Sequence, residues 1–314
     1  MPDIVVMFFL LGLVAGLLRS DLSLPRAAYD TISLLLMLTI GLKGGMALYG
    51  NLDWKLLPEL LAVITLGASI PLLLFPVLHR VVRLNLADSA GIAAHYGSVS
   101  AGTFAVALAY VESRNLAYAP EVTLYLVAME LPAIVVGLLL YRRMQPSTLA
   151  QPSLNKLWHE ALTNRSVILL LGGVLIGMMY GPQLGAQVTD LYLSAFKAVL
   201  ALFLLEMGLT AAETLRPIPW GRWRLILFAL VIPPILALAG IGVALLLDLS
   251  PGTAIILASL AASASYIAAP VAISSAIKEA NIGLAMLASL GLTFPFNVLI
   301  GIGFYHWLID SVIG

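Results

Sequence analysis

The sequence contains no cysteine and very few charged residues. Without cysteine there is no disulfide, no thiolate metal site and no cysteine nucleophile. Charged residues make up only 10% of the 314, and the 16 basic side chains are balanced by 16 acidic ones. A soluble domain carries about 25% charged residues, and a nucleic-acid-binding domain carries a basic excess. Both classes of protein are therefore excluded.

The chain is rich in long apolar runs. Hydrophobic residues make up 61% of it, and its mean hydropathy is +1.03. A helix needs about 20 apolar residues to cross a hydrocarbon core of about 30 Å. This criterion predicts ten membrane spans, at 3–18, 27–48, 56–78, 87–112, 121–141, 166–181, 188–212, 222–247, 251–277 and 281–309. The first 18 residues lack a basic segment and a cleavage site, so we interpret them as a span rather than a signal peptide.

The basic residues of the short connections predict how the chain is oriented in the membrane. Of the 16 Lys and Arg residues, 12 fall in the odd-numbered connections, four of them in the long polar segment 142–165. The even-numbered connections contain Lys55 and Arg114. Segment 142–165 is therefore expected in the cytoplasm, with both termini outside.

A weak internal repeat relates the two halves of the chain at offsets of 161 to 167 residues. The matches, in order, pair Gly12 and Gly16 with Gly173 and Gly177, run 38–43 with 205–210, Ile70-Pro71 with Ile232-Pro233, Ser98-Val99-Ser100 with Ser263-Ala264-Ser265, and Pro132 with Pro295. Because each half has an odd number of spans, the second half crosses the membrane in the opposite sense, as in many transporters. We therefore expect an all-α membrane protein of two inverted five-helix repeats, 1–141 and 166–314, joined by the cytoplasmic linker 142–165.

The fourth and ninth spans both contain residues that interrupt a helix at mid-membrane. The fourth has the run HYGSVSAG at 95–102, and the ninth has Ser263 and Ser265 followed by Pro270, which is best tolerated in a first turn. Such a break is acceptable where it is buried in protein or lines a cavity. Two broken helices would present two half-helix N-termini, with their partial positive charge, to a small anion. The alternative is that Gly and Ser merely allow close helix packing.

Three runs of the sequence carry a resemblance to a known family. AAHYGSVSAGTFAVALAYVE (93–112), ASASYIAAPVAI (262–273) and ASLGLTFPFNVLIGI (288–302) resemble the SbtA family of cyanobacterial sodium-dependent bicarbonate transporters, and the similarity extends over essentially the whole chain. It implies sodium-coupled bicarbonate uptake across the plasma membrane in a carbon concentrating mechanism, with Na⁺ as coupling ion and no cofactor. It also implies a homotrimer with gate and core domains and a cytoplasmic PII-like regulatory protein. The linker is shorter than is usual in that family, which puts regulation through it in doubt.

The resemblance also predicts site residues. The family's substrate region corresponds here to Gly97, Ser98, Ser100, Thr103, Ser263, Ser265 and Tyr266. Hydroxyl groups suit bicarbonate because they both donate and accept hydrogen bonds. Sodium takes oxygen ligands, and the residues expected to contribute are Glu130, Glu206, Thr293, Phe294 and Asn297. His95, beside the first break, is either a proton relay or a hydrogen-bonded packing residue.

Two other functions remain open at this point. A sodium-coupled carrier of another small anion, such as an organic anion, would have the same architecture but needs a wider pocket and a basic residue at the breaks. A channel or an intramembrane enzyme is the second alternative. The sequence has no HExxH or GxSxG motif and no paired carboxylates on one helix, so we expect no enzyme.

Overall fold

The computed structural model describes residues 3–51, 53–54, 56–144, 159, 162–216 and 220–313. Over these ranges the chain is helical, without a strand. Within the described residues, eight helical segments, some of them made of consecutive shorter helices, are long and apolar enough to cross a membrane, and two further apolar helices, α1 (Ile4–Leu18) and α11 (Pro251–Ala261), are shorter. The expectation of an all-α membrane protein is confirmed.

In the first half of the chain, the helices end close to the predicted boundaries. After α1 come α2 (Arg26–Leu48), α3 (Leu56–Pro76) with its π-helical continuation η1 (Val77–Val82), α4 (Leu86–Gly97), α5 (Ala101–Ser113) and α6 (Val122–Met144). Helices α4 and α5 occupy the predicted fourth span and are separated by residues 98–100. Ser100 begins α5, because its side chain accepts a hydrogen bond from the Thr103 N–H and so caps the new helix.

The second half also contains an interruption, which lies in the predicted ninth span. It contains α8 (Arg165–Leu184), α9 (Ala186–Thr214), η2 (Trp220–Arg222), α10 (Trp223–Leu246), α11, α12 (Ala268–Ala276), α13 (Ile282–Met286), η3 (Leu287–Thr293), α14 (Phe294–Phe296), η4 (Asn297–Gly301) and α15 (Ile302–Ile313). Residues 262–267 separate α11 from α12, and Pro270 lies in the first turn of α12, as predicted. The π-helical turns η3 and η4 flank Pro295, which cannot donate a backbone hydrogen bond.

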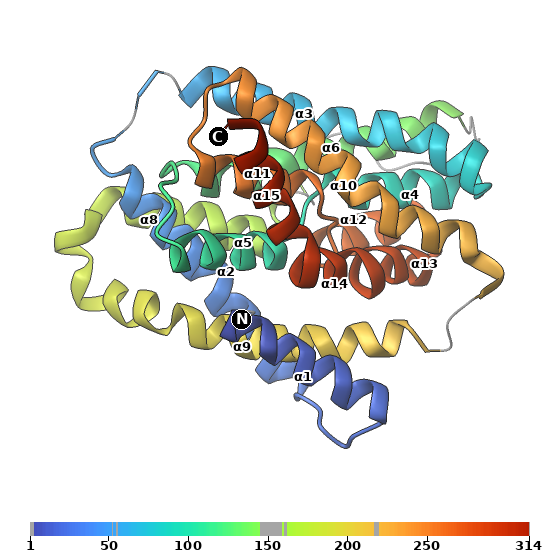
Figure 1. Ribbon diagram of the computed structural model, residues 1–314, viewed down its shortest axis with the longest axis horizontal. Helices are drawn as coiled ribbons and strands as arrows, with labels where there is room; N and C mark the ends of the chain where they lie inside the picture. Colours follow the sequence, from blue (N-terminus) through green and yellow to red (C-terminus); the bar gives the residue numbers. More distant parts are fainter. Residues whose placement is uncertain are drawn as a thin grey trace.

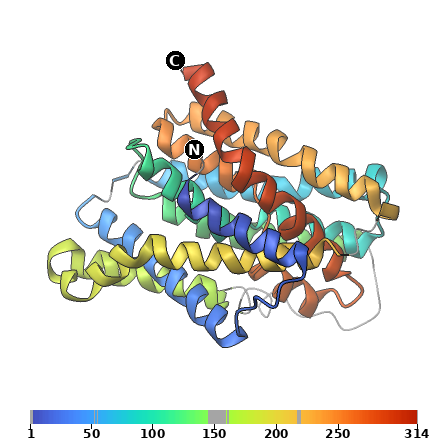
Figure 2. The same ribbon diagram turned by 60° about the horizontal axis from the view of Figure 1, so that its bottom comes forward.

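The helices form two groups that lie side by side (Figures 1 and 2). The four-helix group consists of α1, α2, α8 and α9, in which α1 packs along α9 and α2 packs along α8. The central group consists of α3 to α6 and α10 to α15. The α4–α5 span is 94% buried, against 33% for α8 and for α9, so the interrupted fourth span is enclosed by protein.

Glycines bring the paired helices of the four-helix group into backbone contact. The contacts join Gly12 to Leu205, Gly208 to Phe9, Gly173 to Leu38 and Gly41 to Leu170. At each of these glycines, an added Cβ would collide with the carbonyl oxygen of its partner. Such small-residue contacts are a usual way for helices to associate in a membrane, where no hydrophobic effect drives them together.

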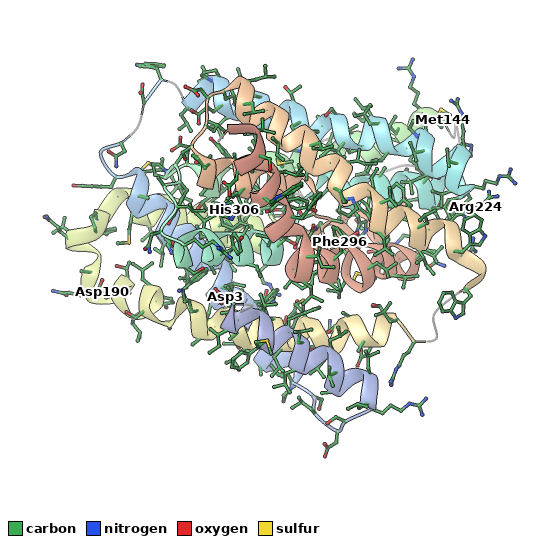
Figure 3. The ribbon with its side chains drawn as sticks, viewed as in Figure 1. Asp3, Met144, Asp190, Arg224, Phe296 and His306 are labelled. Carbon is green, nitrogen blue, oxygen red and sulfur yellow. The ribbon has the colours of Figure 1, made fainter. Side chains whose placement is uncertain are left out.

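The labelled side chains show which residues lie at the two ends of the molecule. Arg224 and Met144, which follows Arg142 and Arg143 on α6, lie at one end, and Asp190 lies at the other (Figure 3). Both chain termini lie away from the end that carries Arg224 (Figure 1). Most of the predicted linker, residues 145–158, lies outside the described residues.

Candidate functional site

The two helix interruptions lie against each other inside the central group. The Ser100 N–H donates to the Ser263 hydroxyl at 2.8 Å, and the Ser265 N–H donates to the His95 carbonyl at 2.7 Å. The Nδ1 of His95 lies 2.7 Å from the carbonyl oxygen of Ser265, which is 170 positions away in sequence. The interrupted backbones therefore satisfy part of each other's hydrogen-bonding need.

A small cavity lies where these segments meet. Its lining includes Ser100, Ala101, Glu130, Ser265, Tyr266 and Ala268, and its volume of about 10 Å³ has room for about one water molecule. Ala101 and Ala268 are the first residues of α5 and α12, so two helix N-termini border the cavity. First-turn N–H groups have no acceptor within their own helix and carry partial positive charge. No Lys or Arg lines this cavity among the described residues, so these N-termini supply its positive potential.

Four buried polar atoms around the interruptions have no hydrogen-bond partner within the described part of the chain. They are His95 Nε2, Ser98 Oγ, Thr103 Oγ1 and the Tyr266 hydroxyl, which lies beside Ser100 without a well-directed bond. A carbonyl only accepts, so Nδ1 of His95 is the donor to Ser265, and Nε2 of the neutral ring is an acceptor. A buried polar group left unpaired costs about 1–3 kcal/mol. The interruptions therefore offer three hydroxyls and one acceptor to a small polar ligand.

The predicted substrate residues fall into distinct positions at this site. Ser100, Ser265 and Tyr266 line the cavity. Ser98 and Thr103 do not line it, but each lies within two residues of a lining residue and has an unpartnered hydroxyl. The structure thus brings these five residues to the crossing of the two interruptions.

The other two predicted substrate residues support the crossing from within the protein. The Ser263 hydroxyl accepts from the Ser100 N–H and donates to the Leu260 carbonyl at 2.8 Å, so both of its roles are occupied. Gly97 ends α4 against Pro71, whose ring leaves no room for a Cβ. These residues hold the interruptions together rather than line the cavity.

The two carboxylates predicted to bind sodium lie in different places. Glu130 of α6 is 6% exposed and lines the cavity together with Ser100 and Ser265. Glu206 of α9 lies beside Thr210 and the backbone of Leu24, and it is not among the cavity residues. The structure therefore brings Glu130 to the site and leaves Glu206 in the four-helix group.

The predicted sodium-binding residues of the predicted tenth span pack around the crossing of the two interruptions. Thr293 lies 2.7 Å from the Tyr96 hydroxyl and donates to the Ala229 carbonyl at 2.9 Å. Asn297 donates to the Ala262 carbonyl at 2.9 Å, and the ring of Phe294 packs edge-on against Tyr266. Their polar atoms are engaged with the protein, and Asn297 fixes the first residue of the second interruption.

The His95 ring joins α4 to the second interruption through Nδ1, which supports the packing role, and its Nε2 has no partner among the described residues. Ser166 of α8 also lines the cavity, and sequence analysis did not single it out. It comes from the four-helix group, whereas the other lining residues named above belong to the central group. Its only signal in the sequence is a lone hydroxyl at the start of the sixth span.

Two larger cavities lie between the four-helix group and the central group. The linker-side cavity, of about 290 Å³, includes Thr163, Asn164 and Val271, and it shares Glu130 and Ala268 with the small cavity. The cavity at the N-terminal side, of about 360 Å³, includes Asp3 and Arg114 and shares no residue with the small one. The candidate site therefore shares lining residues with the linker-side cavity and none with the cavity at the N-terminal side.

Helices of membrane-crossing length throughout the described ranges, two of them separated from their neighbours by interruptions that meet at a small polar cavity, define a multi-pass membrane protein. The chain belongs to the Na⁺-dependent bicarbonate transporter superfamily, whose family model matches residues 4–310. This match covers nearly the whole chain and confirms the resemblance noted in the sequence. No curated protein matches the sequence.

Proposed function

We propose that the protein is a sodium-coupled secondary transporter that imports bicarbonate across the plasma membrane by alternating access. The observation that carries this proposal is the crossing of two helix interruptions at a cavity that has helix N-termini, the unpartnered hydroxyl of Tyr266 and no fixed cation among its described lining residues. Bicarbonate is a planar anion whose oxygens accept from N–H and hydroxyl groups, and its own O–H can donate to Nε2 of His95. Binding by dipoles holds the anion without a strong ion pair that would slow its release.

The size of the cavity favours a small substrate. At about 10 Å³ it must widen even for bicarbonate, and a larger organic anion requires a correspondingly greater rearrangement of the crossed segments. The alternative substrate is another small anion. Inhibition of labelled bicarbonate uptake by acetate or formate tests this alternative directly.

Glu130 supports the coupling to sodium. Its carboxylate lines the cavity proposed for the anion, and two like charges 4 Å apart repel by about 4 kcal/mol at an effective dielectric constant of 20. A sodium ion beside Glu130 removes this repulsion, so sodium and bicarbonate each raise the affinity for the other. The family to which the chain belongs is sodium-dependent, which supports the same assignment.

The helix contacts support two inverted repeats of five spans, 1–141 and 166–314. The backbone contacts of the four-helix group come in pairs related by the repeat offsets of 161 and 167: Gly12–Leu205 corresponds to Gly173–Leu38, and Phe9–Gly208 to Leu170–Gly41. The two large cavities correspond in the same way, with Val6 and Val106 in one and Val167 and Val271 in the other. In this arrangement, α4–α5 and α11–α12 are the interrupted fourth and ninth spans.

The two large cavities support alternating access. They lie at the boundary between the four-helix group, which we assign as the gate domain, and the central group, which we assign as the core domain. On the side away from the linker, Lys43 of α2 forms an ion pair with Glu112 of α5 across this boundary. This ion pair and the linker-side cavity support an inward-facing state, and we propose that exchange to the outward-facing state separates Lys43 from Glu112 while the linker-side cavity closes.

Family resemblance supports the remaining parts of the proposal. These are a homotrimer, the cyanobacterial plasma membrane, a role in a carbon concentrating mechanism and a cytoplasmic PII-like regulator. Arginines such as Arg80 and Arg216 lie in connections on the expected cytoplasmic side, where such a regulator would bind.

Sodium-driven uptake is the direct test of the function. Cells that express the protein should accumulate radiolabelled bicarbonate in sodium medium, and uptake should fall to the level of control cells when potassium replaces sodium. Equal uptake in the two media would show that sodium does not drive transport. Uptake of labelled acetate but not bicarbonate would establish the alternative substrate class.

The orientation can be tested on the natural, cysteine-free chain. A cysteine at Thr163 should react with a membrane-impermeant maleimide only after the membrane is opened, whereas a cysteine at Ser311 should react in intact cells. Both side chains are exposed, so access to the reagent decides the outcome. The opposite labelling pattern would show that the basic connections and the linker face outward.

A further inference from the structure

An open groove of about 580 Å³ lies on the surface of the central group, between η1 and α10. Its α10 wall is a stripe of residues spaced four apart, so that they share one face of the helix: Leu227, Val231 and Ile235. Their side chains are 53%, 48% and 51% exposed. At 1.5 Å per residue, the stripe from Trp223 to Ile235 runs for about 18 Å. The groove is therefore long, apolar and open toward the lipid.

One end of the groove is strongly basic. Arg80 of η1, Arg83 directly after η1 and Arg224 of α10 line it, and no acidic residue lines it among the described residues. The Arg224 side chain donates to the Val81 carbonyl at 3.5 Å and projects at the end of the molecule that carries Met144 (Figure 3). The first turn of α10 contains no acidic residue, so its partial positive charge adds to that of the arginines.

We propose that this groove is a binding site for an anionic glycerophospholipid of the cytoplasmic leaflet. The phosphate lies among the three guanidinium groups, which match phosphate oxygens in charge and geometry, and one acyl chain lies along the α10 stripe. A zwitterionic lipid fills the apolar part equally well but carries a cation that the arginines repel. A soluble acidic partner matches the arginines but leaves the apolar stripe uncovered. The combination of a basic end and an apolar length therefore selects an anionic lipid.

The size of the preference follows from the charges. A basic residue at the membrane surface contributes about a five- to tenfold gain for an anionic lipid, so two or more should give at least about a tenfold preference. This site does not depend on the transported substrate, because no residue that lines it lines the candidate transport cavity.

Quenching by brominated lipids measures this preference in the reconstituted full chain. A bimane label on a single cysteine at Leu227 reports on the groove, and the same label at Leu230, which is 40% exposed at similar depth on α10 but outside the groove, is the matched control. In phosphatidylcholine vesicles, brominated phosphatidylglycerol should quench the Leu227 label at about tenfold lower mole fraction than brominated phosphatidylcholine. The Leu230 label should show no preference. A label at Val231 gives a second groove position if the first variant fails to fold.

Substitution of the arginines tests where the preference comes from. Arg80→Gln combined with Arg224→Gln should reduce the preference at Leu227 to about one, whereas Arg143→Gln, an exposed arginine at the same end but outside the groove, should leave it unchanged. If the two lipids quench the Leu227 label equally in the protein that keeps its natural arginines, the groove contacts lipids without selecting among them. That result would overturn the proposal. Full relief of phosphatidylglycerol quenching by excess inorganic phosphate would overturn it as well, because the site would then be for free phosphate.

Discussion

The Ser98→Ala variant is expected to reach half-maximal uptake at a bicarbonate concentration about ten- to a hundredfold above that of the natural protein. The Ser98 hydroxyl is fully buried and has no partner among the described residues, so it is available to a bound anion. A hydrogen bond to a charged group contributes about 1.5–3 kcal/mol, which is this factor in affinity. Because the substitution breaks no bond within the described part of the protein, its thermal stability in detergent should not fall.

The matched control for this experiment is Ser259→Ala. Ser259 is also fully buried, but its hydroxyl donates to the Ile255 carbonyl within α11 and lies outside the interruption. Its loss should leave the half-saturating bicarbonate concentration unchanged. Unchanged affinity in Ser98→Ala, at normal membrane levels of the protein, would mean that Ser98 does not contact the substrate.

The Glu130→Gln variant is expected to bind bicarbonate almost independently of sodium. An ionised carboxylate at this position repels the anion unless a cation neutralises it, and a coupling of this kind amounts to about 1–3 kcal/mol, or about five- to 150-fold in affinity. Glutamine keeps the shape of the side chain and removes its charge. Sodium therefore has less repulsion between this side chain and the anion to offset. The measurement is the half-saturating bicarbonate concentration over a series of sodium concentrations, with potassium making up the difference.

Glu206→Gln is the comparison that separates the two predicted sodium carboxylates. Glu206 does not line the cavity, so its variant should keep the sodium dependence of the natural protein. If Glu130→Gln kept that dependence and Glu206→Gln lost it, sodium would be bound in the four-helix group and the role proposed for Glu130 would be wrong.

Local sequence signals predicted where the helices of this chain end. The interruption at 98–100 follows from the run of Gly and Ser in the fourth span, and Pro270 correctly marks the first turn of α12. These features depend on neighbouring residues, through capping groups and the missing N–H of proline. The positions that the predicted repeat offsets pair also lie in backbone contacts, such as Gly12–Leu205 and Gly173–Leu38, while the repeat itself stays a prediction.

Contacts between residues far apart in the sequence were much harder to predict from the sequence. Glu130 and Glu206 are both acidic residues inside apolar spans, and nothing in their local sequence distinguishes the one that lines the cavity. Ser166 carried no motif at all, yet it is the cavity residue that the four-helix group contributes. Similarly, Ser263 looked equivalent to Ser98, but its hydroxyl is fully engaged within the protein, whereas that of Ser98 has no partner among the described residues.

The amino-acid sequence was sufficient to establish a helical membrane protein, its family and the interruptions of its fourth and ninth spans. Hydropathy, helix-breaking residues and family motifs are properties of short stretches of chain, so they can be recognised without coordinates. The folded arrangement was needed to show that the two interruptions bond to each other, that Glu130 lines the cavity between them and that this cavity shares residues with a larger one on the linker side. These features depend on how helices more than a hundred residues apart pack, and packing is set by the whole set of side-chain shapes rather than by any local pattern.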